Sequence, residues 1–294
     1  MTRIINALSD ISDQYGALYV DLWGCLHDGV QAYPAAVAAL QKYRKSGGKV
    51  VLLTNAPRHR ASVQEQIESM NVPADCWDTI ASSGDSARAS MFRGAVGEKV
   101  WYIGPDSDLT FFDPINIVKN PVSIQRVPLD QADGIVCIGP FDPHADPSVM
   151  RPEFLAAKQK GLKLLCANPD IVVDRGGVRE WCAGALAALY TEMGGEVLYV
   201  GKPHPAIYDL ARNRLNELGG DVPDSRILCI GDGIKTDIAG GLGEDLDTLF
   251  ITGGLAAVET KTADHKDAQP DAVALKAYLD KEMIPTRFAM GFFR

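Results

Sequence analysis

A single aspartate ends an apolar run in the stretch YVDLWGCLHDG, which spans residues 19–29. Asp21 follows the run and precedes a loop that contains Gly24, as expected where a strand delivers a side chain to the edge of a sheet. A carboxylate in such a place can attack phosphorus and form a covalent acyl-phosphate intermediate. Taken alone, an aspartate at a strand end is more often a turn or cap residue, so this chemistry needs support from other positions.

Three further apolar runs end in polar residues that suit phosphoryl chemistry. Thr54 and Asn55 end the run KVVLLTN and can hold phosphoryl oxygens together with the following backbone N–H groups, although such residues also close strands and cap helices. Lys202, in VGKPHP, would neutralise phosphoryl charge if its ammonium group is buried near the nucleophile; the alternative is a surface lysine. Asp232 and Asp237, in CIGDGIKTDIAGG, offer the oxygen ligands that suit Mg²⁺, or else form an Asp-Gly turn and a helix cap.

Two charged loops are candidates for contact with the substrate. Arg58 lies in the segment RHR shortly after Asn55, where it could bind the anionic part of a substrate or simply start a solvated helix. A second cluster, beside Gly176 and Gly177, contains Asn168, Asp170, Asp174, Arg175 and Arg179. A glycine-containing loop of mixed charge could select the leaving group, or it is an ordinary surface loop.

Alternating strand and helix patterns must position these residues. Continuous β-branched or aliphatic runs predict strands at residues 17–22, 49–55, 100–104, 134–139, 163–168, 196–200, 226–231 and 248–252. Such runs are typical of parallel strands that are buried on both faces. Helix patterns lie between them, for example from Pro34 to Gly47 and from Pro205 to Gly219. We therefore predict right-handed βαβ crossovers and a doubly wound α/β fold with a parallel sheet.

The strand endings divide the chain into two predicted domains. In a doubly wound sheet the ligand lies beyond the carboxyl ends of the strands, so the strands that end in the candidate residues should be neighbours. The strands in the middle of the chain end without such groups. We therefore predict a core domain at residues 1–79 and 196–294, and an α/β domain inserted into it at residues 80–195.

Composition excludes several classes of function. The 294 residues carry a formal charge of −9 with a pI near 5.1, which argues against non-specific binding to nucleic acid or to a membrane surface. No apolar run reaches the length of a membrane span, and the N-terminus lacks the apolar core of a signal peptide. The six cysteines form no C-x-x-C pair, so we expect buried, reduced thiols in a cytoplasmic protein. The apolar tail at residues 288–293 should pack on the core or on a second copy of the chain, which leaves a homodimer open.

In their order along the chain, these motifs resemble those of the haloacid dehalogenase-like (HAD) hydrolase superfamily. The likeness is greatest to subclass IIA, the nitrophenyl-phosphatase and sugar-phosphatase-like group, and it covers nearly the whole chain. Asp21 matches the nucleophile motif, Thr54 the second motif, Lys202 the third, and Asp232 with Asp237 the fourth. The resemblance implies a HAD-like Rossmannoid core and an α/β cap, inserted between the second and third motifs, that opens and closes over the substrate.

The resemblance also implies a Mg²⁺ cofactor that is held by Asp21, by the backbone carbonyl of Trp23 and by Asp232, and we add Asp237 to this metal shell. With the interpretations given above, Asp21 and Lys202 are the predicted catalytic residues. The predicted ligands of phosphate or substrate are Thr54, Asn55, Arg58 and Lys202.

Trp23 departs from the family pattern. Phosphatases of the family carry a second aspartate there, which protonates the leaving oxygen and then activates the hydrolytic water. Indole offers only an N–H donor, and general acid–base catalysis contributes roughly 10²- to 10⁴-fold, or about 3–5 kcal/mol of barrier. Another group could replace the acid: His27 and Asp28 are close in sequence, and the cap could offer further candidates. Alternatively, the leaving group needs little protonation, as in aryl, enol or acyl phosphates.

The sequence thus predicts a Mg²⁺-dependent phosphatase that hydrolyses a small phosphorylated metabolite through an aspartyl-phosphate on Asp21. Two alternatives stay open because of Trp23. One is a metal-independent hydrolase of the dehalogenase type, since dehalogenases of the superfamily typically have an aromatic residue at this position. The other is a weakly catalytic protein that binds a phosphorylated metabolite.

Overall fold

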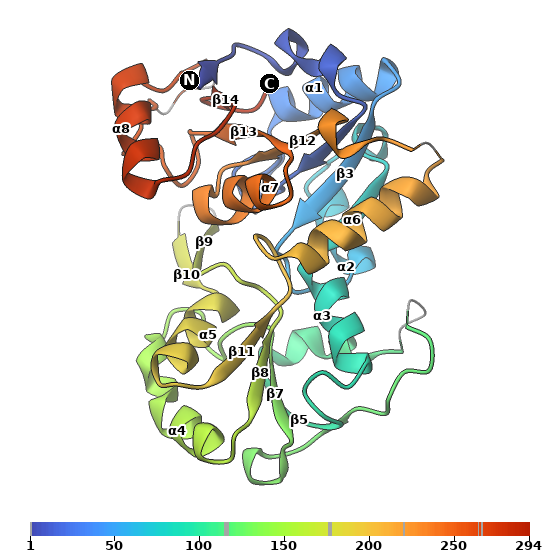
Figure 1. The fold of residues 1–294 in the computed structure, drawn as a ribbon, viewed down its shortest axis with the longest axis vertical. Helices are drawn as coiled ribbons and strands as arrows, with labels where there is room; N and C mark the ends of the chain where they lie inside the picture. The colour runs from blue at the N-terminus through green and yellow to red at the C-terminus, as the bar shows by residue number, and fades with distance from the viewer. Residues whose placement is uncertain (1, 115–117, 176–177, 220, 264, 266) are drawn as a thin grey trace. The chain divides into compact units, whose positions relative to one another are not determined.

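Helices and strands alternate along the computed structural model, which describes residues 2–114, 118–175, 178–219, 221–263, 265 and 267–294 (Figure 1). Contacts within the chain divide it into two compact units. The first unit comprises Met1–Thr54, Gln64–Ala81 and Tyr208–Arg294, and the second comprises Asn55–Val63 and Ser82–Ile207. Each unit contains a parallel sheet with helices, which confirms the predicted α/β class.

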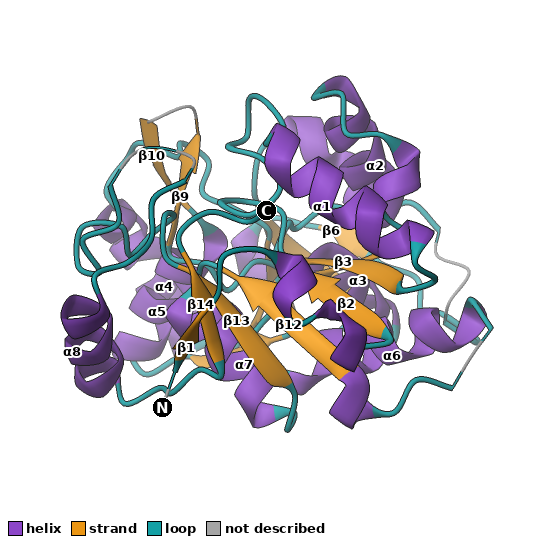
Figure 2. Cartoon of the chain, turned by 90° about the horizontal axis from the view of Figure 1, so that it is seen from above, coloured by secondary structure: helices purple, strands orange, loops and turns teal. Residues whose placement is uncertain are grey.

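A seven-stranded sheet forms the centre of the first unit. Its strands follow in the order β1 (Arg3–Ile4), β14 (Phe288–Met290), β13 (Asp247–Ile251), β12 (Ile227–Gly231), β2 (Ala17–Val20), β3 (Lys49–Thr54) and β4 (Thr79–Ser82). Neighbouring strands from β1 to β3 are parallel, and Figure 2 shows several of them side by side. Every residue of the central strands β2 and β12 is buried, as expected for apolar strands inside a doubly wound sheet.

Five helices belong mainly to the first unit: α1 (Pro34–Lys45), α2 (Arg60–Ser69), α6 (Pro205–Glu217), α7 (Ala239–Gly243) and α8 (Ala272–Glu282). Helix α1 begins at its predicted proline and stops before Gly47, whose φ of 96° favours glycine. Helix α8 packs Leu275 and Leu279 onto the buried Phe250 and Ala289. Since Ala289 lies in β14, the apolar tail packs on the core, which is one of its two predicted places.

A second, five-stranded parallel sheet forms the centre of the other unit. Its order is β11 (Glu196–Tyr199), β8 (Lys163–Cys166), β7 (Gly134–Cys137), β5 (Lys99–Ile103) and β6 (Gln125–Arg126). Helices α3 (Ser83–Phe92), α4 (Arg151–Gln159) and α5 (Ala183–Glu192) belong to the same unit. Ile135 of β7 packs in a cluster with α4 and α5, whereas Val136 packs in a cluster with α3. Alternate residues of the sheet are therefore covered on opposite faces.

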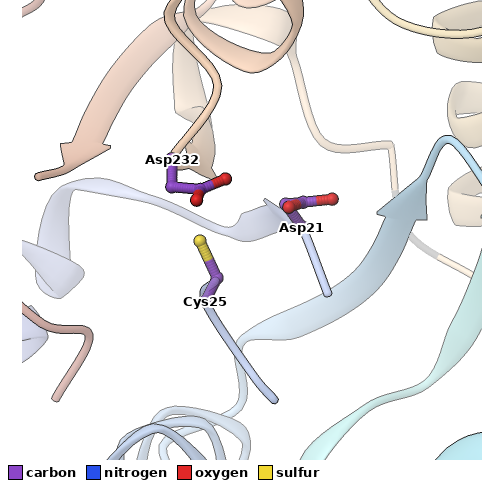
Figure 3. A group of neighbouring side chains, drawn as sticks. All are labelled: Asp21, Cys25 and Asp232. Atoms are coloured by element: carbon purple, nitrogen blue, oxygen red, sulfur yellow. The ribbon is translucent and has the colours of Figure 1, made fainter. Parts of the chain in front are cut away.

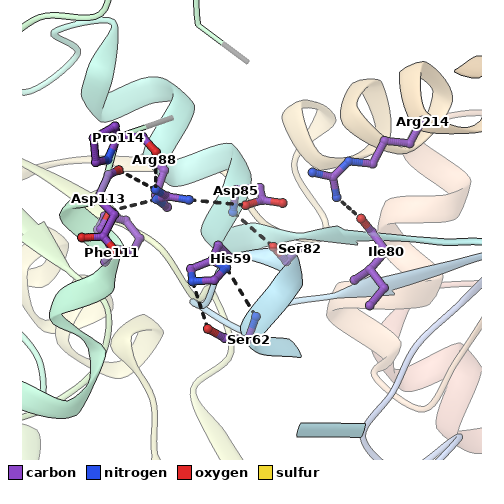
Figure 4. A network of polar contacts seen from close by, with 10 residues as sticks. All are labelled: His59, Ser62, Ile80, Ser82, Asp85, Arg88, Phe111, Asp113, Pro114 and Arg214. Carbon is purple, nitrogen blue, oxygen red and sulfur yellow. Dashed lines mark hydrogen bonds and ion pairs between the residues drawn. The ribbon is translucent and has the colours of Figure 1, made fainter. Parts of the chain in front are cut away.

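The buried Arg88 joins helix α3 to the segment that follows β5. Its guanidinium donates to the carbonyl oxygens of Phe111 at 2.9 Å and Asp113 at 2.6 Å (Figure 4). Burial lowers the pKa of Arg88, and the nearby Asp85 carboxylate acts against that shift. The segment that Arg88 binds includes the 3-10 turn Asp106–Phe112.

Short 3-10 turns also occur elsewhere in the chain. They are Leu8–Asp10, Ser12–Gln14, Ala74–Cys76, Leu129–Gln131, Pro147–Met150 and Asp224–Arg226.

Strand β11 differs from the sequence prediction. The sequence predicts residues 196–200 as a strand of the core domain, with the domain boundary before residue 196, but β11 pairs with β8 in the five-stranded sheet. The second unit accordingly extends to Ile207 and also includes Asn55–Val63. The physical reason is that both sheets are parallel and covered on both faces, so an apolar strand has the same pattern in either one.

The charged loop near residues 168–180 also differs from its predicted form. Strands β9 (Val172–Arg175) and β10 (Val178–Trp181) pair antiparallel as a hairpin, with Arg179 opposite Asp174. The Arg179 guanidinium makes two hydrogen bonds of 2.8 Å to that carboxylate. Gly176 and Gly177 lie outside the described residues.

The six cysteines are buried thiols outside disulfides, as predicted. Desolvation raises the pKa of the Cys76 thiol to about 11 and that of Cys137 to about 12, so both thiols are neutral at physiological pH. Among the residues that the structure describes, none of the helices has both the length and the apolar character required to cross a bilayer.

Candidate active site

Three adjacent strands of the first unit end in buried polar side chains. Thr54 is the last residue of β3, Asp21 follows β2, and Asp232 follows β12. Val20 pairs with Ile230, and the Asp21 N–H donates to the carbonyl oxygen of Ile230 at 2.9 Å. Because parallel strands end at the same edge of a sheet, these side chains gather where ligands bind in doubly wound folds.

Asp21 and Asp232 form a compact group with Cys25. Their potential ligand atoms, one carboxylate oxygen from each aspartate and the thiol sulfur, all lie within 4.8 Å of one another (Figure 3). All three residues are buried, and the sulfur points toward the Asp232 carboxylate. Within the part of the chain that the structure describes, this group of potential metal ligands contains two of the predicted ones, Asp21 and Asp232.

The Asp232 carboxylate lies in a narrow space between two glycines. Its Oδ2 accepts the N–H of Leu255 at 3.1 Å. A Cβ atom at Gly24 would lie 2.2 Å from this oxygen, and one at Gly254 would lie 2.0 Å from it. Gly24 also has a φ of 73°, which other L residues rarely adopt. The two glycines therefore define where this carboxylate can lie.

Asp237 lies in a π-helical turn, Ile234–Ile238, directly after the Asp232 loop. Its Oδ2 accepts the N–H of Gly233 at 3.1 Å and faces the hydroxyl of Thr236 at 3.2 Å. A Cβ at Gly231 would come within 2.1 Å of the Asp237 Cγ. Asp237 thus packs over the end of β12 and is not in the group of Asp21, Cys25 and Asp232, so its assignment to the metal shell stays a prediction.

The donor set at this edge fits a hard divalent cation. Two buried carboxylates on neighbouring strand ends provide the oxygen ligands that Mg²⁺ or a similar ion takes, usually together with several waters. The thiol of Cys25 is a soft ligand, which favours ions such as Zn²⁺ and is poorly suited to Mg²⁺. Asp21 and Asp232 are therefore the residues of this group that would hold Mg²⁺.

The loop after Asp21 is compact. The carbonyl oxygen of Leu22 accepts the N–H groups of Cys25, Leu26 and His27 at 3.3, 2.8 and 3.0 Å. The sequence predicts Cys25 only as one of the buried thiols, but this turn brings it back toward the two carboxylates. The sequence clue to this position is that Cys25 lies four residues after the predicted nucleophile Asp21. This spacing alone does not reveal the turn.

Asn55 organises a second polar group, within the second unit. Its Oδ1 accepts the N–H of Lys202 at 2.7 Å, while its Nδ2 donates to the Lys202 carbonyl at 3.1 Å and to the Asp170 carboxylate at 2.8 Å. Lys202 is only 2% exposed, so it is not a surface lysine. A Cβ at Gly201 would lie 2.6 Å from both Asn55 Oδ1 and Ser83 Oγ, so only glycine fits beside this group. Asp170 was proposed only as part of a charged loop, and its contact with Asn55 joins residues 115 positions apart.

Arg58 and His59 have local partners in the second unit. The Arg58 guanidinium forms an ion pair with Asp108 at 3.2 Å and is 37% exposed. His59 Nδ1 accepts the N–H of Ser62 at 3.3 Å at the start of α2, in the manner of a helix cap (Figure 4). These contacts agree with the helix-start interpretation of the segment, and substrate binding by Arg58 stays a prediction.

The same architecture occurs in solved hydrolases. A family model described as haloacid dehalogenase-like hydrolase matches residues 18–117, and one described as HAD-hydrolase-like matches residues 199–277. A haloacid dehalogenase-like hydrolase from Brucella suis 1330 is 32% identical, with a TM-score of 0.85 over 99% of this chain and 100% of that chain. The chain belongs to the haloacid dehalogenase-like hydrolases. The predicted family and its subclass IIA are thereby confirmed.

More distant members of the family carry phosphatase names. Ribonucleotide monophosphatase NagD of Escherichia coli K12 is 24% identical over 235 residues, which cover 80% of this chain and 86% of NagD. A glycerol phosphate phosphatase from Mycobacterium tuberculosis, solved in complex with magnesium, is 23% identical with a TM-score of 0.63, over 88% of this HAD-like chain and 75% of that one. This last likeness shows the fold alone.

Proposed function

We propose that this HAD-like hydrolase is a divalent-metal-dependent phosphatase that acts on a small phosphorylated metabolite through an aspartyl-phosphate on Asp21. The observation that carries the proposal is the pairing of two buried carboxylates, Asp21 and Asp232, at the ends of adjacent parallel strands. The phosphatase names of NagD and of the glycerol phosphate phosphatase support the reaction class. The magnesium complex of the latter supports the choice of cofactor.

In the first step, a carboxylate oxygen of Asp21 attacks phosphorus and the bond from phosphorus to the leaving oxygen breaks. The electron pair of that bond departs on the leaving oxygen. A bound Mg²⁺ supplies charge neutralisation for the phosphoryl oxygens. Asp21 lies almost fully buried at the strand end, where its backbone is fixed by the hydrogen bond to Ile230. This fixed position reduces the freedom that the nucleophile must lose before it attacks.

In the second step, water attacks the phosphorus of the aspartyl-phosphate. The electron pair of the broken bond returns to the Asp21 carboxylate, and the proton lost by water leaves with the phosphate product. Thr54, Asn55 and Lys202 are assigned to the phosphoryl oxygens, as predicted from the sequence. Support comes from the burial of all three residues and from the double hydrogen bond that fixes Lys202 to Asn55.

We assign the role of the cap to residues 82–199, the part of the second unit that contains its five-stranded sheet and excludes Asn55 and Lys202. It has its own sheet and its own two hydrophobic clusters, which suits a body that moves as a whole. The hairpin β9–β10 and Asp170 would select the leaving group.

A metal-independent hydrolase of the dehalogenase type is the second candidate, because Trp23 lies where such enzymes have an aromatic residue. Carbon–halogen cleavage by Asp21 would need no second carboxylate beside the nucleophile. Asp232, confined by two glycines close to Asp21, favours the metal-dependent reaction instead.

The test measures phosphate release from p-nitrophenyl phosphate and acetyl phosphate, with Mg²⁺ and with a chelator. We expect release that requires the metal and is abolished by Asp21→Asn. Asp13→Asn, which changes an exposed carboxylate, is the matched control and should retain the wild-type rate. Halide release from haloacids that survives the chelator would instead establish the second candidate, and phosphate release that survives the chelator would contradict the metal dependence. Metal binding without turnover on either substrate would contradict the proposal.

A further inference from the structure

Trp23 is held in a fixed position by its own loop. Its indole lies against the backbone at Gly29, where a Cβ atom would be 2.2 Å from Cζ3 and 2.4 Å from Cη2. Gly29 has a φ of 85°, so both its conformation and its neighbour require glycine. The ring of His27 packs edge-on against the indole, with 5.2 Å between the ring centroids and 73° between the planes. The contacts with Gly29 and His27 thus fix the indole of Trp23, two residues after Asp21.

The two candidates for a replacement acid close to Trp23 in sequence, His27 and Asp28, already form hydrogen bonds within the loop. His27 is completely buried, and its Nδ1 accepts the N–H of Gly29 at 3.0 Å. That hydrogen bond uses Nδ1 of the ring as an acceptor. Asp28 Oδ1 accepts the N–H groups of Val30 and Gln31, both at 2.8 Å. Burial acts to raise the pKa of Asp28, but the hydrogen bonds outweigh it and lower the pKa, so the carboxyl is ionised at neutral pH.

Cys25 also carries a proton on this loop, on its thiol. Its sulfur points toward the Asp232 carboxylate, on the side of the predicted metal ligands (Figure 3). In an in-line displacement the leaving oxygen lies opposite the attacking oxygen of Asp21. Within the described loop from Asp21 to Gln31, the side chains of Trp23, His27, Asp28 and Cys25 therefore offer no proton in the place where family phosphatases have their acid.

We propose that Trp23 makes this enzyme selective for phosphate donors whose leaving group departs as a stable anion: aryl, enol or acyl phosphates. The inference rests on the proposed phosphatase function and names its substrate class. Trp23 is the specificity-determining residue, and His27 and Gly29 are positioning residues that hold the indole.

The chemistry balances without an acid. The carboxylate of Asp21 forms a bond to phosphorus, and the leaving oxygen departs with the electron pair as a phenolate, enolate or carboxylate, which takes its proton later from solvent. An alkyl phosphate would have to expel an alkoxide, which is far less stable. General acid catalysis contributes roughly 10²- to 10⁴-fold, so alkyl phosphates should lose about that much relative to a family member with an aspartate here.

The experiment measures kcat/KM for phosphate release, with Mg²⁺, over a series of substituted phenyl phosphates, simple alkyl phosphates and acetyl phosphate. For the wild-type protein we expect kcat/KM to rise steeply as the pKa of the leaving group falls. This comparison needs no variant, so a folding defect cannot obscure it. A wild-type enzyme that cleaves alkyl and aryl phosphates equally well would overturn the proposal.

Three variants at position 23 separate the effect of supplying a proton from the effect of changing the side-chain volume. Trp23→Asp should raise kcat/KM for alkyl phosphates by about 10²- to 10⁴-fold over Trp23→Asn, which has the same size but no acid. The two variants should differ by less than about tenfold on acetyl phosphate, whose leaving group needs no proton. Trp23→Phe should keep the wild-type dependence on leaving group. An equal gain in Trp23→Asp and Trp23→Asn would show that the indole acts only by filling space, and would refute the assignment.

Failure of the inference can be distinguished from failure of the proposed function. If acetyl phosphate and p-nitrophenyl phosphate are both inert while metal binds, the phosphatase assignment itself is wrong. If they are hydrolysed and the rate does not depend on the leaving group, only the substrate class is wrong. In that case Cys25→Ala tests the thiol as the acid, because the dependence on leaving group should then steepen in the variant.

Discussion

Replacing Gly254 with alanine should weaken metal binding without removing a ligand. The new Cβ would lie 2.0 Å from Asp232 Oδ2, whereas real Cβ contacts essentially never fall below 3.0 Å, so the oxygen must move by about 1 Å. Metal–oxygen distances tolerate shifts of only about 0.2 Å. The displacement should also disturb the 3.1 Å hydrogen bond from Leu255. Loss of such support typically lowers metal affinity about 10- to 100-fold, or about 1.4–2.7 kcal/mol.

Calorimetric titration of the full chain with Mg²⁺ or Mn²⁺ measures this change directly and requires no substrate. Gly243→Ala is the matched control, because a Cβ there meets nothing within 4 Å and its φ is not in the left-handed region. Both variants should unfold cooperatively in urea, which separates a local displacement from a general loss of structure. Unchanged metal affinity in Gly254→Ala would refute the role given to Asp232.

Three further predictions concern the tryptophan loop, the Asn55 group and pH. Gly29→Ala should lower the free energy of unfolding in urea by about 1–3 kcal/mol more than Gly47→Ala. Both glycines have a positive φ, but only Gly29 has the Trp23 indole against it. Equal losses would contradict this packing. Asn55→Ala should lower kcat/KM about 10²-fold because it frees the backbone of Lys202, and an unchanged value would show that this clamp is irrelevant. Burial raises the pKa of Cys76 from 9.0 to about 11, so between these values the native state retains a thiol proton that the unfolded chain loses. The free energy of unfolding should therefore fall from pH 9 to 11, and should fall less in Cys76→Ala. Identical pH profiles of the two proteins would contradict this.

The sheet edge that carries Asp21 and Asp232 could be predicted because the sequence patterns that mark it are local. Asp21 and Asp232 each follow an apolar run that is buried throughout, and parallel strands place such endings at one edge. What the sequence could not reveal is which strands are neighbours. Strand β11 illustrates this, because its apolar pattern fits a parallel strand in either sheet and only its pairing with β8 decides the matter.

The contacts that refine the site join positions far apart or depend on a turn. Asn55 reaches Asp170 and Lys202 across 115 and 147 positions, and no local pattern announces such a meeting. Cys25 reaches the carboxylates only because the loop folds back onto the carbonyl of Leu22. In both cases the residue types were visible in the sequence, but the geometry that gives them a role was not.

The most direct test of the account is to trap the covalent intermediate. The protein is mixed with Mg²⁺ and acetyl phosphate, quenched in acid and analysed by mass spectrometry of the intact chain and of its peptides. We predict the mass of one added phosphoryl group, located on Asp21 and absent in Asp21→Asn. A phosphoryl group on another residue, or turnover with no such species in rapid-quench samples taken before steady state, would contradict the claim that Asp21 is the nucleophile.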